Sequence, residues 1–145
     1  MSTGKENGHL KGGAFLISTI EAADVFIPEN WDEEQRMIAQ TCQDFIDQKV
    51  VPVLDRIDQQ EEGLVPSLID EAGALGILSV SIPEEYGGFG KDFTTSMLIS
   101  EKTGPGASFS VAAMAHTGIG TLPILYYGNE AQKQQYIPKL ASGGL

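Results

Sequence analysis

An all-α fold, arranged as a multi-helix bundle, is predicted by three features of the sequence. Apolar residues recur at steps of three and four, which is the spacing of a buried helix face. Residues that begin or end helices separate these segments at short intervals. Strand alternation is weak and confined to residues 77–82. We therefore expect about six helices with short loops, packed as an orthogonal or up-and-down bundle.

Residues 1–28 are expected to form a loosely held tail ahead of a helical domain at 29–145. The tail mixes Lys and Glu with four glycines, and its apolar patch at 14–17 is expected to dock onto the domain, because a free apolar patch favours aggregation. The glycines are Gly4, Gly8, Gly12 and Gly13.

The first helix is predicted to begin at Asn30, which precedes Glu33 by three residues as in a capping box. Its apolar stripe continues beyond Pro52, so the proline is expected to kink the helix. The segment Glu61-Glu62-Gly63 ends the element. The predicted buried face consists of Ile38, Cys42, Phe45, Ile46, Val50, Val53, Leu54 and Ile57.

The second helix is predicted at residues 65–75, because Pro66 suits a first turn and Gly76 suits the left-handed residue after the last turn. The glycine-rich segment 83–90 is predicted to be a turn-rich loop. A third helix follows at 93–103, with Asp92 as its cap.

Charged residues are absent from residues 107–127, where small and apolar side chains dominate. Helices are predicted at 107–117 and 121–127, and the stretch is expected to be buried on most sides. The last helix is predicted to begin at Asn129, with Gln132 completing a capping box. Pro138 is expected to limit it, and residues 142–145 show no stop signal of their own.

The net charge of −11 excludes the usual nucleic-acid binders, which present clusters of Lys and Arg. Ten acids and three bases lie between residues 29 and 62, as expected for a solvated helix face, with docking to a basic partner as the alternative. No apolar run approaches the roughly 20 residues of a membrane span, and no secretory signal is visible. A cytoplasmic protein is expected, although a mature mitochondrial matrix protein would look the same.

No catalytic constellation is visible in the chain. Cys42 is the single cysteine and lies in a helical pattern, so it is interpreted as a small buried hydrophobe, and no zinc site is expected. His116 has no identifiable partner for acid or base catalysis and is interpreted as structural. The loop at 87–90 lacks phosphate-binding spacing, and Glu84 and Glu85 beside it would repel phosphate.

Three segments of the sequence form a pattern by their order and spacing. They are Leu75-Gly76-Ile77 with Ser81-Ile82-Pro83-Glu84-Glu85-Tyr86-Gly87-Gly88-Phe89-Gly90, Gly118-Ile119-Gly120 with Pro123-Ile124, and Tyr127-Gly128-Asn129-Glu130-Ala131-Gln132-Lys133 continuing to Gly143. Together they resemble the amino-terminal domain of acyl-CoA dehydrogenases. The resemblance covers about residues 31 to 145, and residues 107–120 with the tail at 11–17 resemble the very-long-chain branch.

The resemblance implies a flavoenzyme that oxidises fatty acyl-CoA to trans-2-enoyl-CoA and passes electrons to an electron-transfer flavoprotein. In this family FAD lies between a β-domain and a carboxy-terminal domain, and a Glu base removes the α-proton. These parts would follow Leu145, so no catalytic residue is expected in this chain, which would be inactive alone. We expect a fragment of a homo-oligomeric enzyme, with a truncated gene product as the alternative. Gly144 departs from the acid that the family usually has there.

By the same resemblance, Met114, Ala115, Gly118 and Ile119 are expected to line the far end of the acyl pocket. Small side chains leave volume for a longer tail, so a medium-to-long acyl substrate is predicted. Ordinary close helix packing is the alternative for these four residues. Two other functions stay open: a domain of an acyl-CoA oxidase, and a stand-alone helical interaction module without catalysis.

Overall fold

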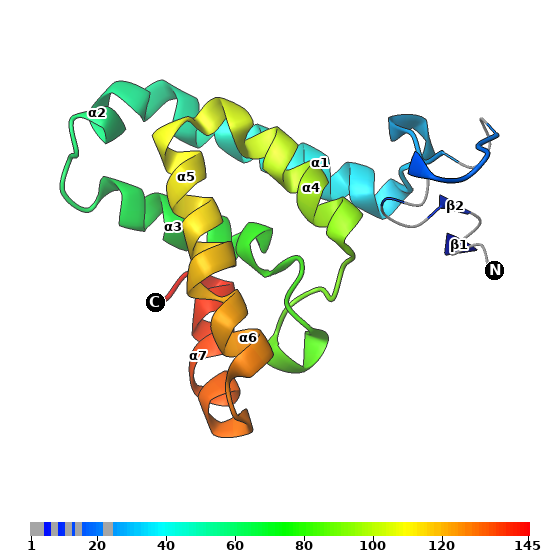
Figure 1. Cartoon of the computed structure of the whole chain (residues 1–145). Helices are drawn as coiled ribbons and strands as arrows, with labels where there is room; N and C mark the ends of the chain where they lie inside the picture. The colour runs from blue at the N-terminus through cyan, green and yellow to red at the C-terminus, as the bar shows by residue number, and fades with distance from the viewer. Residues whose placement is uncertain (1–4, 7–8, 11–12, 14–15, 22–24) are drawn as a thin grey trace. The chain divides into compact units, whose positions relative to one another are not determined.

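The computed structural model describes residues 5–6, 9–10, 13, 16–21 and 25–145, in two units, Met1–Glu33 and Glu34–Leu145. In the first unit, β1 (Lys5–Glu6) pairs with β2 (His9–Leu10) in a short antiparallel ladder (Figure 1). Of the tail features singled out above, Gly4, Gly8, Gly12 and residues 14–15 lie outside the described residues. Leu16 and Ile17, which complete the apolar patch, are exposed.

The first α-helix, α1 (Glu33–Phe45), begins three residues later than the sequence predicts. Asn30 ends a short 3-10 helix, Pro28–Asn30, and its Oδ1 accepts a hydrogen bond of 2.9 Å from the N–H of Ile27. The predicted capping box of Asn30 with Glu33 is therefore wrong. The proline at the first position of the 3-10 helix fixes a tight turn there, and Asn30 closes that turn.

The predicted kink at Pro52 is confirmed. The chain after α1 stays helical but changes its hydrogen bonding, through a π turn at Ile46–Val50 and a 3-10 turn at Val51–Val53, before α2 (Leu54–Asp58). Proline has no N–H to donate, so the regular α pattern cannot pass through it. The predicted apolar face is largely buried, with Cys42, Phe45, Ile46, Val50 and Ile57 in the core.

The next two α-helices lie within one residue of their predicted bounds: α3 (Leu64–Ala74) and α4 (Phe93–Thr103). Gly76 adopts the predicted left-handed conformation, with φ 78°, and Asp92 accepts the N–H of Thr95 at 2.9 Å. The weak strand signal at 77–82 is wrong. That segment forms the 3-10 helix Ile77–Ser79 and a turn, because the glycine-rich loop, with its 3-10 helix Glu84–Tyr86, folds back onto it.

Residues 108–127 form one helical path where two helices were predicted. α5 (Ser108–Ala115) passes through a π turn, His116–Gly120, into α6 (Leu122–Tyr127), as Figure 1 shows. The hydroxyl of Thr121 donates to the carbonyl of His116 at 2.7 Å and so links the end of the π turn to its beginning. The break at Gly104–Gly106 that precedes α5 is a 3-10 turn.

The last helix, α7 (Glu130–Ser142), begins with the predicted capping box of Asn129 and Gln132. It runs through Pro138, against the prediction, because Ile137 and Leu140 on either side are buried in the core. It also has a stop signal that was missed. Gly143 has φ 80°, and the N–H of Gly144 donates to the carbonyl of Lys139 at 2.9 Å, which is the Schellman arrangement.

Two apolar clusters hold the second unit together. The first lies among α1, α2, α3 and α5, where the rings of Phe45 and Phe109 stand 5.8 Å apart. The second joins α6 and α7 to the glycine-rich loop, and its members are Ile82, Tyr86, Leu125, Ile137, Leu140 and Ala141. The multi-helix bundle is thus confirmed, with the path from α5 to α6 connecting both clusters (Figure 1).

Candidate functional site

One side of the helical path from Ser108 to Tyr127 is an uncharged apolar surface that the described residues leave open. Val111 is 69% exposed, Met114 55% and Ile119 82%. The expectation that this stretch is buried on most sides is wrong within the described chain, since most of its residues are half-buried or exposed. Its buried side chains include Phe109, Ala113 and Leu125, on the opposite side.

The four residues expected to line an acyl pocket all belong to α5 and the π turn after it. Met114, Ala115 and Ile119 are exposed and Gly118 is half-buried. A Cβ atom built on Gly118 would meet no heavy atom within 4 Å, so close helix packing does not explain the glycine in the described chain. We name Val111, Met114, Ala115, Gly118 and Ile119 the open face.

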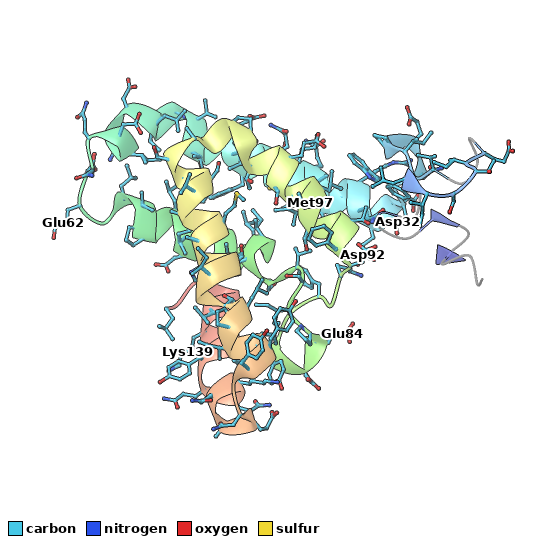
Figure 2. All side chains as sticks on the ribbon, viewed as in Figure 1. Asp32, Glu62, Glu84, Asp92, Met97 and Lys139 are labelled. Carbon is cyan, nitrogen blue, oxygen red and sulfur yellow. The ribbon has the colours of Figure 1, made fainter. Side chains whose placement is uncertain are left out.

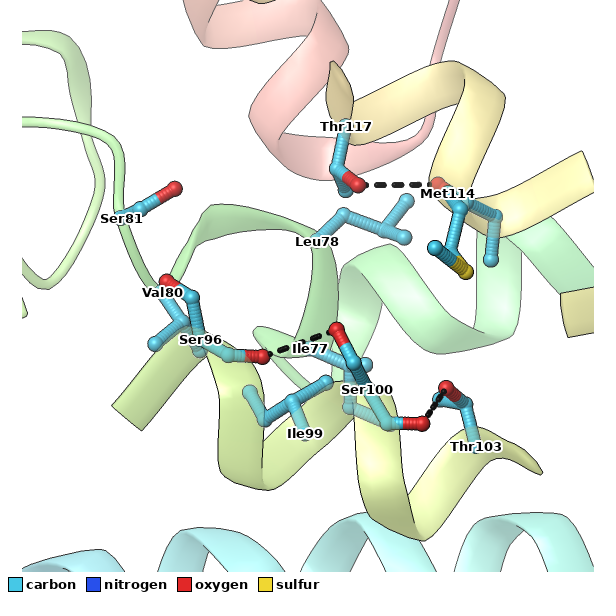
Figure 3. A pocket seen from close by; sticks show the side chains of 11 residues that line it. Ile77, Leu78, Val80, Ser81, Ser96, Ile99, Ser100, Thr103, Met114 and Thr117 are labelled. Atoms are coloured by element: carbon cyan, nitrogen blue, oxygen red, sulfur yellow. Dashed lines mark hydrogen bonds between the residues drawn. The ribbon is translucent and has the colours of Figure 1, made fainter. Parts of the chain in front are cut away.

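A pocket of about 90 Å³ adjoins the open face between α4, α5 and residues 77–81 (Figure 3). Sequence reasoning missed it, because it joins segments far apart in the chain. Met114 belongs to both the pocket and the open face. The other lining residues are Ile77, Leu78, Val80, Ser81, Ser96, Ile99, Ser100, Thr103, Ala113 and Thr117, and none is charged.

Three hydroxyl groups in this pocket are already used by the backbone of their own helices. Ser100 donates to the carbonyl of Ser96 at 3.0 Å, Thr103 to that of Ser100 at 3.1 Å, and Thr117 to that of Ala113 at 3.0 Å (Figure 3). A hydroxyl with a satisfied donor has little need of a polar ligand. The pocket wall is therefore uncharged and largely apolar.

His116 and Cys42 have structural surroundings, as the sequence suggests. The Nε2 of His116 lies 2.7 Å from the carbonyl oxygen of Leu140 in the last turn of α7. Cys42 is fully buried, and burial raises the pKa of its thiol to about 11, which disfavours the nucleophilic thiolate.

The glycine-rich loop provides no cradle for the diphosphate of a flavin nucleotide. From Gly87 to Lys91 every backbone N–H donates to a carbonyl of this chain, at 2.8–3.2 Å. Glu84 stands on the same loop, ahead of Asp92 at the beginning of α4 (Figure 2). The loop is therefore the structural turn that was predicted.

The loop is fastened to α7 by a tyrosine and a carboxylate. The buried Tyr86 donates to Oε2 of Glu130 at 3.1 Å. Burial and the hydrogen bond to Glu130 raise the pKa of Tyr86 to about 12. Hydrogen bonds from Gln134 and from Tyr86 lower the pKa of Glu130, so the phenol donates to an ionised carboxylate.

By length and composition alone, the stretch Ser108–Tyr127 could cross a membrane, since it has 20 residues and 18 consecutive residues within it have a mean hydropathy of 1.2. One such helix is weak evidence, because core helices of soluble proteins meet the same criterion. The expectation that no segment spans a membrane stays a prediction.

Comparison with known families decides the identity of this helical unit. The model of the acyl-CoA dehydrogenase N-terminal domain matches residues 32–144. The chain belongs to the acyl-CoA dehydrogenase N-terminal domain family. The order of helices, the glycine-rich loop and the capped last helix described above are therefore features of a family domain.

Three relatives illustrate the range of this similarity. A "Probable acyl-CoA dehydrogenase" of Bacillus subtilis is 45% identical over 133 residues, covering 92% of this chain and 22% of that protein. The crystal structure of an acyl-CoA dehydrogenase complexed with FAD from Bacillus anthracis is 46% identical, with a TM-score of 0.86, covering 92% and 23%. A structure titled electron transferring flavoprotein of Acidaminococcus fermentans is 29% identical, with a TM-score of 0.66, covering 81% and 31%. The chain thus spans less than a third of each of these relatives.

Proposed function

We propose that this domain serves a flavin-dependent acyl-CoA dehydrogenase, where its open face forms part of the wall of the acyl pocket. The observation that carries the proposal is the uncharged, exposed stretch of α5 and the π turn in a domain of this family. Covering such a surface with an acyl tail contributes about 0.8 kcal/mol per buried methylene. In the parent enzyme, FAD would accept the β-hydride. The Bacillus anthracis relative is a complex with FAD.

We propose a medium-to-long acyl chain as the substrate class. Ala115 is small and exposed and Gly118 has open space around it, so the domain leaves volume where larger side chains would fill it. The narrower very-long-chain assignment has no support from the relatives, because those whose names specify a chain length are short-chain specific acyl-CoA dehydrogenases.

We propose an electron-transfer flavoprotein as the acceptor, which is supported by the relative whose structure carries that title. No observation favours an oxidase or a stand-alone interaction module. A homo-oligomer in the cytoplasm, with the mitochondrial matrix as the alternative, stays a prediction.

A chimaera tests the proposal. This chain would replace the matching segment of the Bacillus anthracis enzyme, which is 46% identical to it. The chimaera should retain FAD, and acyl-CoA should bleach the flavin absorbance in single-turnover measurements. A chimaera that folds and holds FAD but is not reduced by acyl-CoA of any length would overturn the proposal.

Two matched substitutions in the chimaera test the pocket wall itself. Ala115→Phe should lower kcat/KM for long acyl-CoA by at least tenfold relative to short acyl-CoA, because the ring narrows the channel. Ala131→Phe is the control, since Ala131 is also exposed but lies on α7. Equal profiles across acyl lengths in the two variants would remove the open face from the acyl site.

A further inference from the structure

We propose that His116 is a positioning residue for the open face, because its imidazole holds the π turn at His116–Gly120 against the end of α7. This inference rests on the proposed function. It adds a residue outside the open face whose role is to set the place of Gly118 and Ile119. The imidazole acts through the turn, since its Nε2 is directed at α7.

Burial of side chains does not fix the π turn. None of its five residues is buried, and Ile119 is 82% exposed. Gly118 and Gly120 have no side chains to pack. The nearest buried positions on either side are Ala113 and Thr121. The stretch between them therefore depends on hydrogen bonds for its position.

The hydrogen bonds of the turn are of two kinds. The hydroxyl of Thr117 donates to the carbonyl of Ala113 at 3.0 Å, and that of Thr121 donates to the carbonyl of His116 at 2.7 Å. Both bonds stay within the helical path, so neither fixes it against another element. The imidazole does so, since its Nε2 lies 2.7 Å from the carbonyl oxygen of Leu140 in α7, which runs beside α6 (Figure 1).

The acceptor of this hydrogen bond belongs to a firmly held part of the domain. Leu140 is buried in the second apolar cluster. Gly73 of α3 crosses the end of α7 so closely that a Cβ atom on it would stand 2.1 Å from the carbonyl oxygen of Ser142. The last turn of α7 is thus a fixed reference for the π turn. Without that reference, an uncommon π turn loses its brace against relaxation, and the two open-face residues that it carries would shift.

The first experiment uses this chain alone and so does not depend on its enzymatic role. Amide hydrogen exchange at Gly120 and Thr121, measured by NMR relative to the amides of α1, should be about tenfold faster in His116→Asn. His116→Gln should restore slow exchange, because glutamine extends its amide N–H about as far as Nε2, whereas asparagine is shorter by one methylene. Equal exchange in the two variants, or unchanged exchange in His116→Asn, would overturn the proposal.

The second experiment connects the turn to the acyl site. In the chimaera, His116→Asn should raise KM for long acyl-CoA about tenfold and leave kcat unchanged, because it removes binding energy common to the ground state and the transition state. The KM for short acyl-CoA, which does not reach the turn, should stay constant, and His116→Gln should restore the long-chain KM. A loss of stability alone would instead lower kcat equally for every acyl length, through a smaller amount of active enzyme.

Asn129→Ala is the matched control. It removes the cap of the same helix and leaves the hydrogen bond to Leu140 in place, so the ratio of long-chain to short-chain KM should not change. A constant ratio in His116→Asn, in a protein whose turn exchanges faster, would refute the positioning role. A chimaera without acyl-CoA activity would instead contradict the proposed function, so the two failures are distinguishable.

Discussion

The imidazole Nε2 of His116 lies 2.7 Å from the carbonyl oxygen of Leu140, and this contact connects the π turn after α5 to the end of α7. A carbonyl can only accept, so Nε2 must carry a hydrogen. Carbonyls in the last turn of a helix lack the regular helical partner, and the Leu140 carbonyl also accepts the N–H of Gly143, at 3.3 Å. The histidine therefore helps to end α7 as well as to position α5.

Removing this imidazole should destabilise the domain. His116→Ala should lower the free energy of unfolding by about 1–2 kcal/mol, because the Leu140 carbonyl loses a partner at a half-buried site. Urea unfolding monitored by circular dichroism would measure the change. Val111→Ala is the control on the path from α5 to α6. Because this side chain is exposed, its removal should change the free energy of unfolding by no more than about 0.5 kcal/mol. Equal losses in the two variants would contradict the structural role of His116.

Asn129 and Asn30 should differ in how much each contributes to the free energy of unfolding. Asn129→Ala should cost about 1 kcal/mol of unfolding free energy, because it removes the side-chain acceptor that caps α7. Asn30→Ala should cost less than half as much, since Asn30 closes a 3-10 turn of three residues. Thermal unfolding of both variants would check the order, and an equal or larger loss at Asn30 would restore the predicted cap for α1.

Two glycines offer a matched test of the crossing between α3 and α7. A Cβ atom on Gly73 would stand 2.1 Å from the carbonyl oxygen of Ser142, whereas one on Gly118 would meet nothing within 4 Å. Gly73→Ala should therefore cost several kcal/mol or prevent folding, because backbone atoms must move apart. Gly118→Ala should be neutral or slightly stabilising. Urea midpoints would compare them, and a harmless Gly73→Ala would show that the helices are farther apart.

Tyr86 should make the domain sensitive to alkaline pH. Its folded-state pKa of about 12 exceeds the ordinary value of 10.0, so its contribution to stability is full below pH 10 and is lost as pH rises toward 12. Tyr86→Phe should flatten the decline of unfolding free energy over this window. All variants would carry Cys42→Ala, because the buried thiol, with a pKa raised to about 11, adds to the alkaline loss. An unchanged slope in Tyr86→Phe would contradict the burial of the phenol.

Signals confined to one turn of the chain predicted the structure well. Asp92 caps α4, Gly76 takes the left-handed conformation after α3, and Asn129 with Gln132 forms the box that begins α7. Each is a hydrogen bond or backbone conformation within three or four residues, so the sequence contains all the partners. The four residues expected at the acyl site lie together on the open face for the same reason, since they are neighbours on one helix.

Features that depend on distant partners could not be predicted. Pro138 does not end α7, because burial of Ile137 and Leu140 outweighs the loss of one backbone donor. The pocket beside Met114 needs α4 and residues 77–81, which no spacing connects to α5. The exposure of residues 108–127 was misjudged because an uncharged sequence predicts that a surface is covered, without saying which molecule covers it.

The π turn at His116–Gly120 changes the rotational phase of the whole segment that follows it. Ala113, Thr121 and Leu125 all face the core at multiples of four residues, a spacing that would drift about 40° per step around an ideal α-helix. The wider turn absorbs one extra residue and cancels that drift. Deleting a single residue there would rotate α6 by about 100° and turn Leu125 toward solvent. The number of residues in the π turn thus decides which face of α6 packs against α7.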